Sequence, residues 1–114
     1  MDCKSIKLYR EVYIYNMKVY YVYILKCSDN TYYTGITSNL IARITEHISG
    51  KHLDSYTYFR RPITLVFYTT FTNAELAIAS EKQIKKWSKA KKEALINGNY
   101  EELPNLAKKT FNKD

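Results

Sequence analysis

The sequence has few of the residues that build cross-linked or membrane-embedded proteins. It holds two cysteines, Cys3 and Cys27, in 114 residues, and neither belongs to a CxxC or a Cys/His pattern. The chain is large enough to fold without a disulfide, so a reducing compartment suits it best. No apolar run is long enough to cross a bilayer, and the first residues lack the apolar core of a signal peptide. We therefore expect a soluble, cytoplasmic protein.

Acidic residues are also scarce. Eleven Asp and Glu stand against eighteen Lys and Arg, which gives a net charge of +7, and twelve tyrosines are interleaved with the basic residues. Lys and Arg neutralise phosphates and aromatic rings stack on bases, so this composition suits a nucleic-acid partner. A basic protein without such a partner fits the composition equally well.

The length, without internal repeats or low-complexity segments, predicts one domain with a single core. Residues 1–16 mix aliphatic residues with tyrosines and predict an appended arm, either an edge strand or a disordered segment. We place the functional domain at residues 17–98 and a basic tail at residues 99–114.

Three apolar segments predict strands. Residues 19–25 are β-branched or aromatic at odd and even positions alike, which indicates a central strand covered on both faces. A turn signal at residues 28–30 precedes a second strand over residues 32–37, where Gly35 lets another backbone or a ligand approach closely. Residues 63–71 predict the third strand.

The segment after the second strand predicts a helix with two basic residues at its margin. Ser38 is a suitable N-cap and Gly50 a suitable stop, so we expect the helix to cover residues 39–49. At about 100° per residue, Arg43 and His47 fall side by side at the border of the buried face. That face comprises Leu40, Ile41, Ile44 and Ile48.

Two further helices follow the third strand. Thr72 and Glu75 form a capping box that opens a helix ending near residue 87, and Ser88 caps another that ends near residue 96. Glu81 is the one acidic residue of the first of these helices at the margin of its buried face. That face comprises Leu76, Ala77, Ser80, Ile84 and Trp87.

Several of these residues suit phosphodiester hydrolysis, which needs a deprotonated water and positive charge against the reacting phosphate. Arg43 offers a permanently charged planar fork that matches phosphate oxygens. Glu81 offers a hard oxygen ligand for one Mg²⁺ or Mn²⁺ that also binds waters and substrate phosphate. Tyr23, Tyr33 and His47 are the candidates for moving protons, and histidine has the most suitable unperturbed pKa, about 6.5.

Each of these side chains also has a structural interpretation. The two tyrosines are ordinary strand residues. Arg43 is placed to pair with Glu46 at i+3, and Glu81 with Lys85 at i+4, a pair worth only about 0.3–0.5 kcal/mol. The histidine suits a helix end beside the C-terminal dipole.

The order and spacing of these residues resemble a known signature. Tyr-Val-Tyr at residues 21–23, Tyr-Thr-Gly at residues 33–35, then Arg43 and His47 resemble the paired-tyrosine motif of the GIY-YIG nuclease superfamily, with Tyr21 at the glycine position of the name motif. Residues 77–92 are similar to the helical signature of its small single-domain branch. The resemblance covers residues 19–96.

The resemblance implies an α+β fold, in which helices flank a three-stranded antiparallel sheet. In GIY-YIG nucleases the two motif tyrosines flank the attacking water, a role that falls to Tyr23 and Tyr33 here. By the same resemblance Arg43 stabilises the phosphate charge and Glu81 holds a single divalent metal. The general base is left open among the two tyrosines and His47. The late asparagine of many members corresponds to Asn97, Asn99 or Asn105.

The turn between the first two strands tests this assignment. A strict two-residue loop would place Tyr23 and Tyr33 on opposite faces of the hairpin, where no shared site is possible. A loop of odd length, with Leu25 opposite Tyr33 and Tyr23 opposite Gly35, places both on one face. The nuclease interpretation therefore predicts an odd loop.

We accordingly expect a divalent-metal-dependent endonuclease acting on branched, damaged or nicked duplex DNA in repair or recombination, with a protein partner as one source of specificity. The alternatives are a DNA-binding module of the same fold without efficient catalysis, and a structural or protein-interaction domain. The basic loop of residues 51–62 suits either a phosphate backbone or plain solvation. The expected DNA-binding residues are Gly35, Lys51, Arg60, Arg61, Lys85 and Lys89.

Overall fold

A computed structural model describes residues 18–103 of the chain, so the predicted arm and most of the predicted tail lie outside the described residues. The sheet has three strands, β1 (Tyr20–Lys26), β2 (Tyr32–Thr37) and β3 (Thr64–Phe71). Their order is β2-β1-β3, and both pairings are antiparallel. β1 is therefore central, as its uninterrupted apolar sequence predicted, and the α+β fold class is confirmed.

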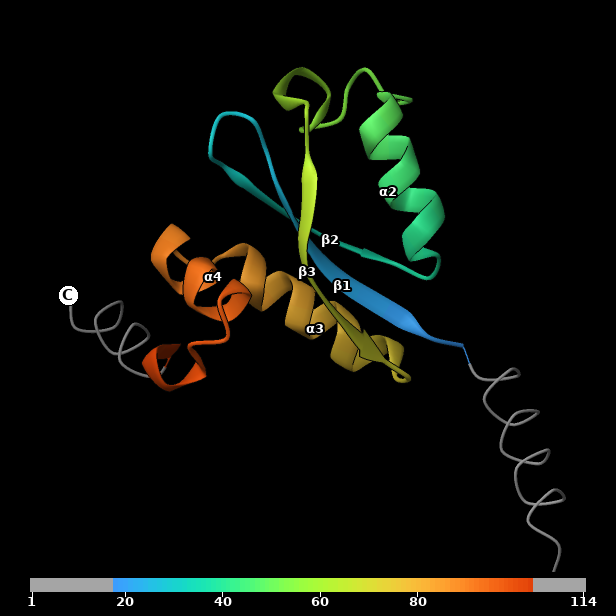
Figure 1. Cartoon of the computed structure of the whole chain (residues 1–114). Coiled ribbons are helices and arrows are strands. Elements are labelled where there is room, and N and C mark those ends of the chain that lie inside the picture. Colours follow the sequence, from blue (N-terminus) through green and yellow to red (C-terminus); the bar gives the residue numbers. More distant parts are fainter. Residues whose placement is uncertain (1–17, 104–114) are drawn as a thin grey trace, which may run out of the picture.

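Helices cover both faces of the sheet (Figure 1). Helix α2 (Leu40–Ser49) lies on one face, and α3 (Ala74–Lys85) with α4 (Lys89–Ile96) lies on the other. Short 3₁₀ turns occur at Tyr58–Arg60 and Tyr100–Glu102. Among residues 18–103 no helix has the length and apolar character needed to cross a membrane.

The core has two parts, separated by β1. Val22 and Ile24 point toward α3, where they pack with Ala77 and Ile84. On the other face a second cluster contains Tyr23, Leu25, Cys27 and Ile63, with Leu40, Ile44, Tyr33 and Leu65 packed against it. Because side chains alternate along each strand, Tyr23 of β1 and Tyr33 of β2 both point to the α2 face.

The helix boundaries confirm two predicted signals and correct two others. Gly50 ends α2 in the left-handed conformation, with φ of 70°, and Ser88 caps α4 as predicted. The N-cap of α2 is Asn39 rather than Ser38, and that of α3 is Asn73 rather than Thr72. Both asparagine side chains accept a hydrogen bond from the amide three residues further along the chain, at 3.2 and 3.0 Å.

The buried faces of the helices are narrower than their apolar residues suggested. Ile41 and Ile48 of α2 are 82% and 58% exposed, and Leu76 of α3 is 61% exposed, so their predicted burial was wrong. The residues of α2 that face the sheet are Leu40, Ile44 and His47. Apolar residues span a wide arc of α2, and the polar contacts of His47 decide which part of that arc faces inward.

Candidate active site

The β1–β2 hairpin has the odd loop that a shared site requires. Five residues, 27–31, connect the strands, because Lys26 pairs with Tyr32. Leu25 consequently lies opposite Tyr33, and Tyr23 opposite Gly35, as predicted. The rings of Tyr23 and Tyr33 lie on the same face with centroids 6.3 Å apart. The register therefore brings the two motif tyrosines together.

Gly35 makes room for one of these rings. A Cβ at Gly35 would lie 2.5 Å from Cζ of Tyr23, far inside van der Waals contact. Any side chain at this position would displace the phenol from its place across β2. Gly35 thus positions Tyr23, and its nucleic-acid contact stays a prediction.

His47 joins the site through two hydrogen bonds. Its Nε2 lies 3.1 Å from the Tyr23 hydroxyl oxygen, and its Nδ1 lies 2.7 Å from Oγ1 of Thr57. Its ring also packs against that of Tyr33, with centroids 5.2 Å apart. His47 is the one buried residue of α2, with 9% of its surface exposed, so it is more than the helix-end residue of the structural interpretation.

Thr57 and Tyr56 are site residues that the sequence did not indicate. Thr57 is buried, and its hydroxyl lies between His47 and Oγ of Ser55, 3.0 Å away. The ring of Tyr56 stacks on Tyr33 at 5.9 Å. Both belong to the loop after α2, which has no periodicity from which their orientation follows; the only available signal was the presence of aromatic and hydroxyl residues among its basic ones.

Burial and the neighbouring charges favour the uncharged forms of Tyr23 and His47. Burial raises the pKa of Tyr23 well above its ordinary value of 10, and the neighbouring Tyr33 phenol raises it further. Burial also lowers the pKa of His47 below its ordinary value of 6.5, and the positive charge of Arg43 adds to this. At neutral pH the pair is therefore a phenol and a neutral imidazole, which is able to accept a proton.

Two charged groups from different helices act on the same phenol. The positive charge of Arg43, on α2, lowers the pKa of Tyr23, whereas the negative charge of Glu81, on α3, raises it. Arg43 is 45% exposed at its side chain, and its Nη1 is 3.9 Å from a carboxylate oxygen of Glu46. This long contact leaves most of the guanidinium donors free. The predicted i+3 pair of Arg43 with Glu46 is thus present, but it leaves the guanidinium able to bind a phosphate.

Glu81 is the candidate metal ligand. Its carboxylate is 14% exposed and lies 3.7 Å from the ammonium of Lys85, which is the predicted i+4 pair. No cluster of three or more His, Cys, Asp or Glu side chains occurs within residues 18–103. A multi-ligand protein cage is therefore not present there, but one carboxylate with waters and phosphate oxygens is a normal magnesium shell, so Glu81 fits such an ion.

The remaining predicted DNA-binding residues lie on two sides of the sheet. Arg60 contacts Asp29 at 3.1 Å and lies over the ring of Tyr56 at 3.8 Å. Arg61 donates to the carbonyl of Tyr58 at 2.9 Å and covers Gly50. Arg60 is therefore held by its own loop and by the β1–β2 turn, and Arg61 by its own loop and the end of α2.

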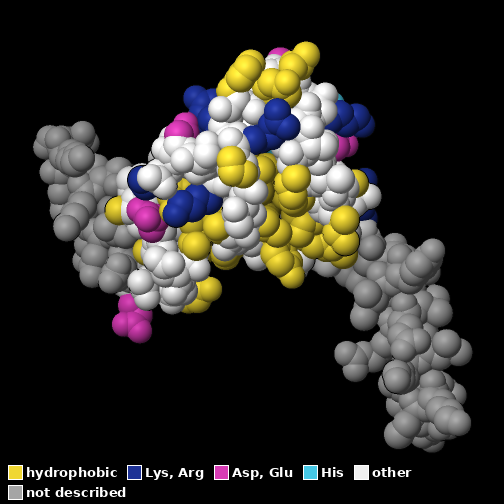
Figure 2. Space-filling model, turned by 45° about the horizontal axis from the view of Figure 1, so that its top comes forward, with side chains coloured by type: hydrophobic (Ala, Val, Ile, Leu, Met, Phe, Trp, Pro, Cys, Tyr) yellow, Lys and Arg dark blue, Asp and Glu magenta, His cyan; other side chains and the backbone are white. Residues whose placement is uncertain are grey.

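Lys51 pairs with Glu46 at 3.8 Å on the α2 side. Lys85 and Lys89 lie on the other side, on α3 and α4. These lysines therefore lie on opposite faces of the sheet. On the face shown in Figure 2, Lys and Arg side chains border a patch of hydrophobic ones, a mixture that suits both phosphates and bases.

Comparisons with known proteins agree with this geometry. The family model described as the GIY-YIG catalytic domain matches residues 19–94. The chain belongs to the GIY-YIG family, whose defining unit is this nuclease-type domain.

The relatives are small UPF0213 proteins. One from Syntrophus aciditrophicus (strain SB) is 47% identical over 83 residues, which are 73% of this chain and 95% of that protein. Another, from Staphylococcus haemolyticus (strain JCSC1435), is 44% identical over 80 residues, covering 70% and 96% of the two chains. The solution NMR structure of a UPF0213 protein from Bacillus halodurans is 42% identical and covers 69% of this chain and 83% of that one, with a TM-score of 0.47.

Proposed function

We propose that this protein is an endonuclease that hydrolyses DNA phosphodiester bonds with one divalent metal ion. A single observation carries the proposal. The Tyr23 hydroxyl is hydrogen-bonded to a neutral histidine and lies in the fields of both Arg43 and Glu81. We infer that His47 acts as the proton acceptor, Arg43 as the phosphate-binding cation and Glu81 as the metal ligand around this hydroxyl group.

The proton path runs through the hydrogen-bonded pair. In our proposal the attacking water gives its proton to the oxygen of Tyr23 while the phenol proton passes to Nε2 of His47. The phenol avoids full ionisation, which its raised pKa opposes at neutral pH. This transfer requires the tautomer of His47 that carries its proton on Nδ1, and Oγ1 of Thr57 is placed to accept that hydrogen. Thr57 is then a positioning residue.

Arg43 and Glu81 are assigned to the negative charge of the reacting phosphate. The guanidinium of Arg43 donates to the oxygens of the reacting phosphate, where negative charge increases in the transition state. Glu81 would hold one Mg²⁺ or Mn²⁺, which supplies positive charge for the phosphate and the leaving oxygen when it is bound. Tyr33 lies against both Tyr23 and His47 and helps to enclose the water.

The substrate class follows from what the sequence does not include. Nothing in the sequence resembles a sequence-reading module, so we infer recognition of DNA structure rather than of sequence. Branched, nicked or damaged duplexes are the proposed substrates, in repair or recombination. A protein partner would deliver further specificity.

Cleavage by purified protein tests the proposal. Labelled branched, nicked and plain duplex DNA are incubated with Mg²⁺ or Mn²⁺, using wild type, Arg43→Ala, Glu81→Gln and, as a control, Lys82→Gln. Lys82 is exposed on the same helix as Glu81. We expect wild type and the control to cleave, and the two site variants to be slower by at least about 100-fold.

The result also separates the alternatives. Equal product from wild type and both site variants would mean contamination and would contradict the proposal. Salt-dependent DNA binding without metal-dependent cleavage would instead indicate a binding module of the same fold.

A further inference from the structure

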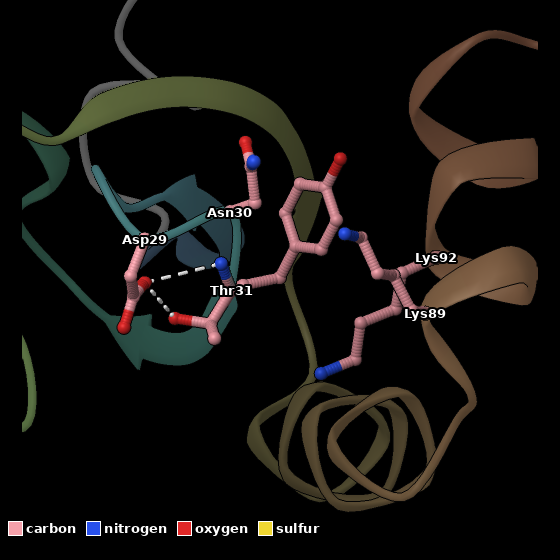
Figure 3. A pocket seen from close by; sticks show the side chains of 6 residues that line it. Asp29, Asn30, Thr31, Lys89 and Lys92 are labelled. Carbon is pink, nitrogen blue, oxygen red and sulfur yellow. Dashed lines mark hydrogen bonds between the residues drawn. The ribbon is translucent and has the colours of Figure 1, made fainter.

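A pocket lined by several polar side chains lies on the α4 side of the sheet, opposite Tyr23 and His47. A cavity of about 280 Å³ separates the β1–β2 turn from the first two turns of α4 (Figure 3). The turn residues face Lys89 and Lys92 across this space. The lining residues are Asp29, Asn30, Thr31, Tyr32, Lys89 and Lys92.

Lys92 is an unusual lining residue because it is buried. It is only 8% exposed, and among the described side chains no ion pair joins it to a carboxylate. Burial lowers its pKa below the ordinary value of 10.5, and the charge of Lys85 lowers it further. Its aliphatic stem is therefore packed in the fold, while its ammonium opens into the pocket without a paired carboxylate.

The two neighbouring acids have other partners. Asp29 accepts hydrogen bonds from Thr31 and from Arg60. Glu93 accepts one from the Tyr32 hydroxyl at 3.3 Å. Among the described side chains neither acid forms an ion pair with Lys89 or Lys92, so the pocket suits an oxyanion.

The pocket and the candidate active site share one edge of the sheet. β2 is an edge strand, and its consecutive residues Tyr32 and Tyr33 point to opposite faces, the first into the pocket and the second toward His47. Lys85 also links the two sites, because it pairs with Glu81 at 3.7 Å and its charge acts on Lys92. A strand of nucleic acid that crosses this edge would touch both.

We propose that Lys89 and Lys92 form a subsite for a non-scissile phosphate group of the substrate strand. This inference rests on the proposed function for the identity of the strand, but the phosphate chemistry follows from the pocket itself. Bound phosphate supplies the anion that Lys92 lacks, so phosphate binding and protonation of this lysine favour each other. The subsite would place the strand along the β2 edge, with another of its phosphates at Arg43.

The first test is direct and needs no turnover. The side-chain NMR signals of Lys92 are followed during pH titrations, alone, with inorganic phosphate and with a short oligonucleotide, in the absence of metal. We expect the pKa of Lys92 to rise with either ligand. An unchanged Lys92 titration with both ligands would overturn the inference. A response to inorganic phosphate but not to the oligonucleotide would overturn the assignment to the substrate strand.

The second test uses variants. DNA affinity without metal is measured against salt for wild type, Lys89→Gln, Lys92→Met and the exposed control Lys82→Gln. We expect about tenfold weaker binding and a salt slope smaller by about one for each pocket variant, and a smaller change for the control. Lys92→Met should fold, because methionine keeps an unbranched apolar stem where the buried part of Lys92 packs; if it does not fold, Lys89→Gln still tests the pocket.

The outcomes distinguish this inference from the proposed function. Pocket variants that bind DNA like Lys82→Gln, in a protein that cleaves DNA, would overturn the subsite and leave the nuclease proposal standing. Weaker binding by the pocket variants, in a protein that never cleaves, would support the subsite and contradict the nuclease proposal.

Discussion

The hydroxyl oxygen of Tyr23 lies 3.1 Å from Nε2 of His47, a contact that joins β1 to α2 across 24 positions of the chain. Both groups are buried, and burial disfavours the charged form of each. In the proposed reaction this hydrogen bond connects the attacking water to the neutral imidazole that accepts the proton.

Loss of the Thr57 hydroxyl should slow the reaction without removing any group that touches the substrate. Thr57→Val keeps the volume but leaves Nδ1 of His47 without its partner, so the imidazole loses its fixed tautomer and orientation. We expect kcat to fall by about tenfold or more, with KM little changed, in single-turnover and steady-state cleavage. Thr57→Ser should restore most of the rate. A loss in Thr57→Ser equal to that in Thr57→Val would assign the effect to packing alone.

The pH dependence of the rate should reflect the lowered pKa of His47. A neutral His47 is needed to accept the proton, and its pKa lies below 6.5. The rate should therefore be constant through neutral pH and fall only as acid protonates the imidazole, at a midpoint below 6.5. The cleavage rate of wild type as a function of pH, beside an NMR titration of His47, measures both quantities. A midpoint above 6.5, or one that differs from the NMR value, would exclude His47 as the acceptor.

Gly35→Ala should disturb the site by moving one ring. The new methyl group would overlap the phenol of Tyr23, so the ring or the strand must shift. We expect a loss of about 1–3 kcal/mol in the free energy of unfolding, measured by urea denaturation, and a large loss of cleavage. In a Tyr23→Ala background, Gly35→Ala should lower the free energy of unfolding by less, because the ring that it overlaps is gone. An equal cost in both backgrounds would show that the ring is not what Gly35 accommodates.

Thr34 offers a stabilising substitution. Its hydroxyl is buried, with no hydrogen-bond partner among the described residues. Replacing it by the methyl group of valine removes the unsatisfied group at nearly constant shape, so Thr34→Val should raise the free energy of unfolding by about 1 kcal/mol. Thr64→Val, at an exposed position of β3, is the control. A destabilised Thr34→Val would mean that the hydroxyl has a partner in solution.

The sequence predicted the structure correctly where one physical rule allowed a single arrangement. The apolar residues of β1 on both faces required a central strand. The shared site required an odd hairpin loop, and the pairing of Tyr23 with Gly35 agrees with it. The helical period brought Arg43 and His47 to one border of α2, and Glu81 to the half-buried border of α3.

The sequence was insufficient where two rules competed. Serine and asparagine are both good caps, and only the backbone decided for Asn39. The apolar residues of α2 fill an arc wider than the buried strip, so its hydrophobic pattern did not exclude Ile41 from the core. Thr57 reaches His47 from an aperiodic loop, and Lys92 is buried on a helix whose pattern gave no reason to expect it. Both orientations come from tertiary packing alone.

The central claim is that residues from β1, α2 and α3 act as one hydrolytic site. Single-turnover cleavage by wild type, Tyr23→Phe, Glu81→Gln and the double variant in Mg²⁺ tests it most directly. Removing either group of one catalytic unit already removes the contribution of the whole unit. We therefore expect the double variant to be about as slow as the slower single variant. Losses that simply multiply, or a wild-type protein whose activity neither substitution reduces, would contradict the account.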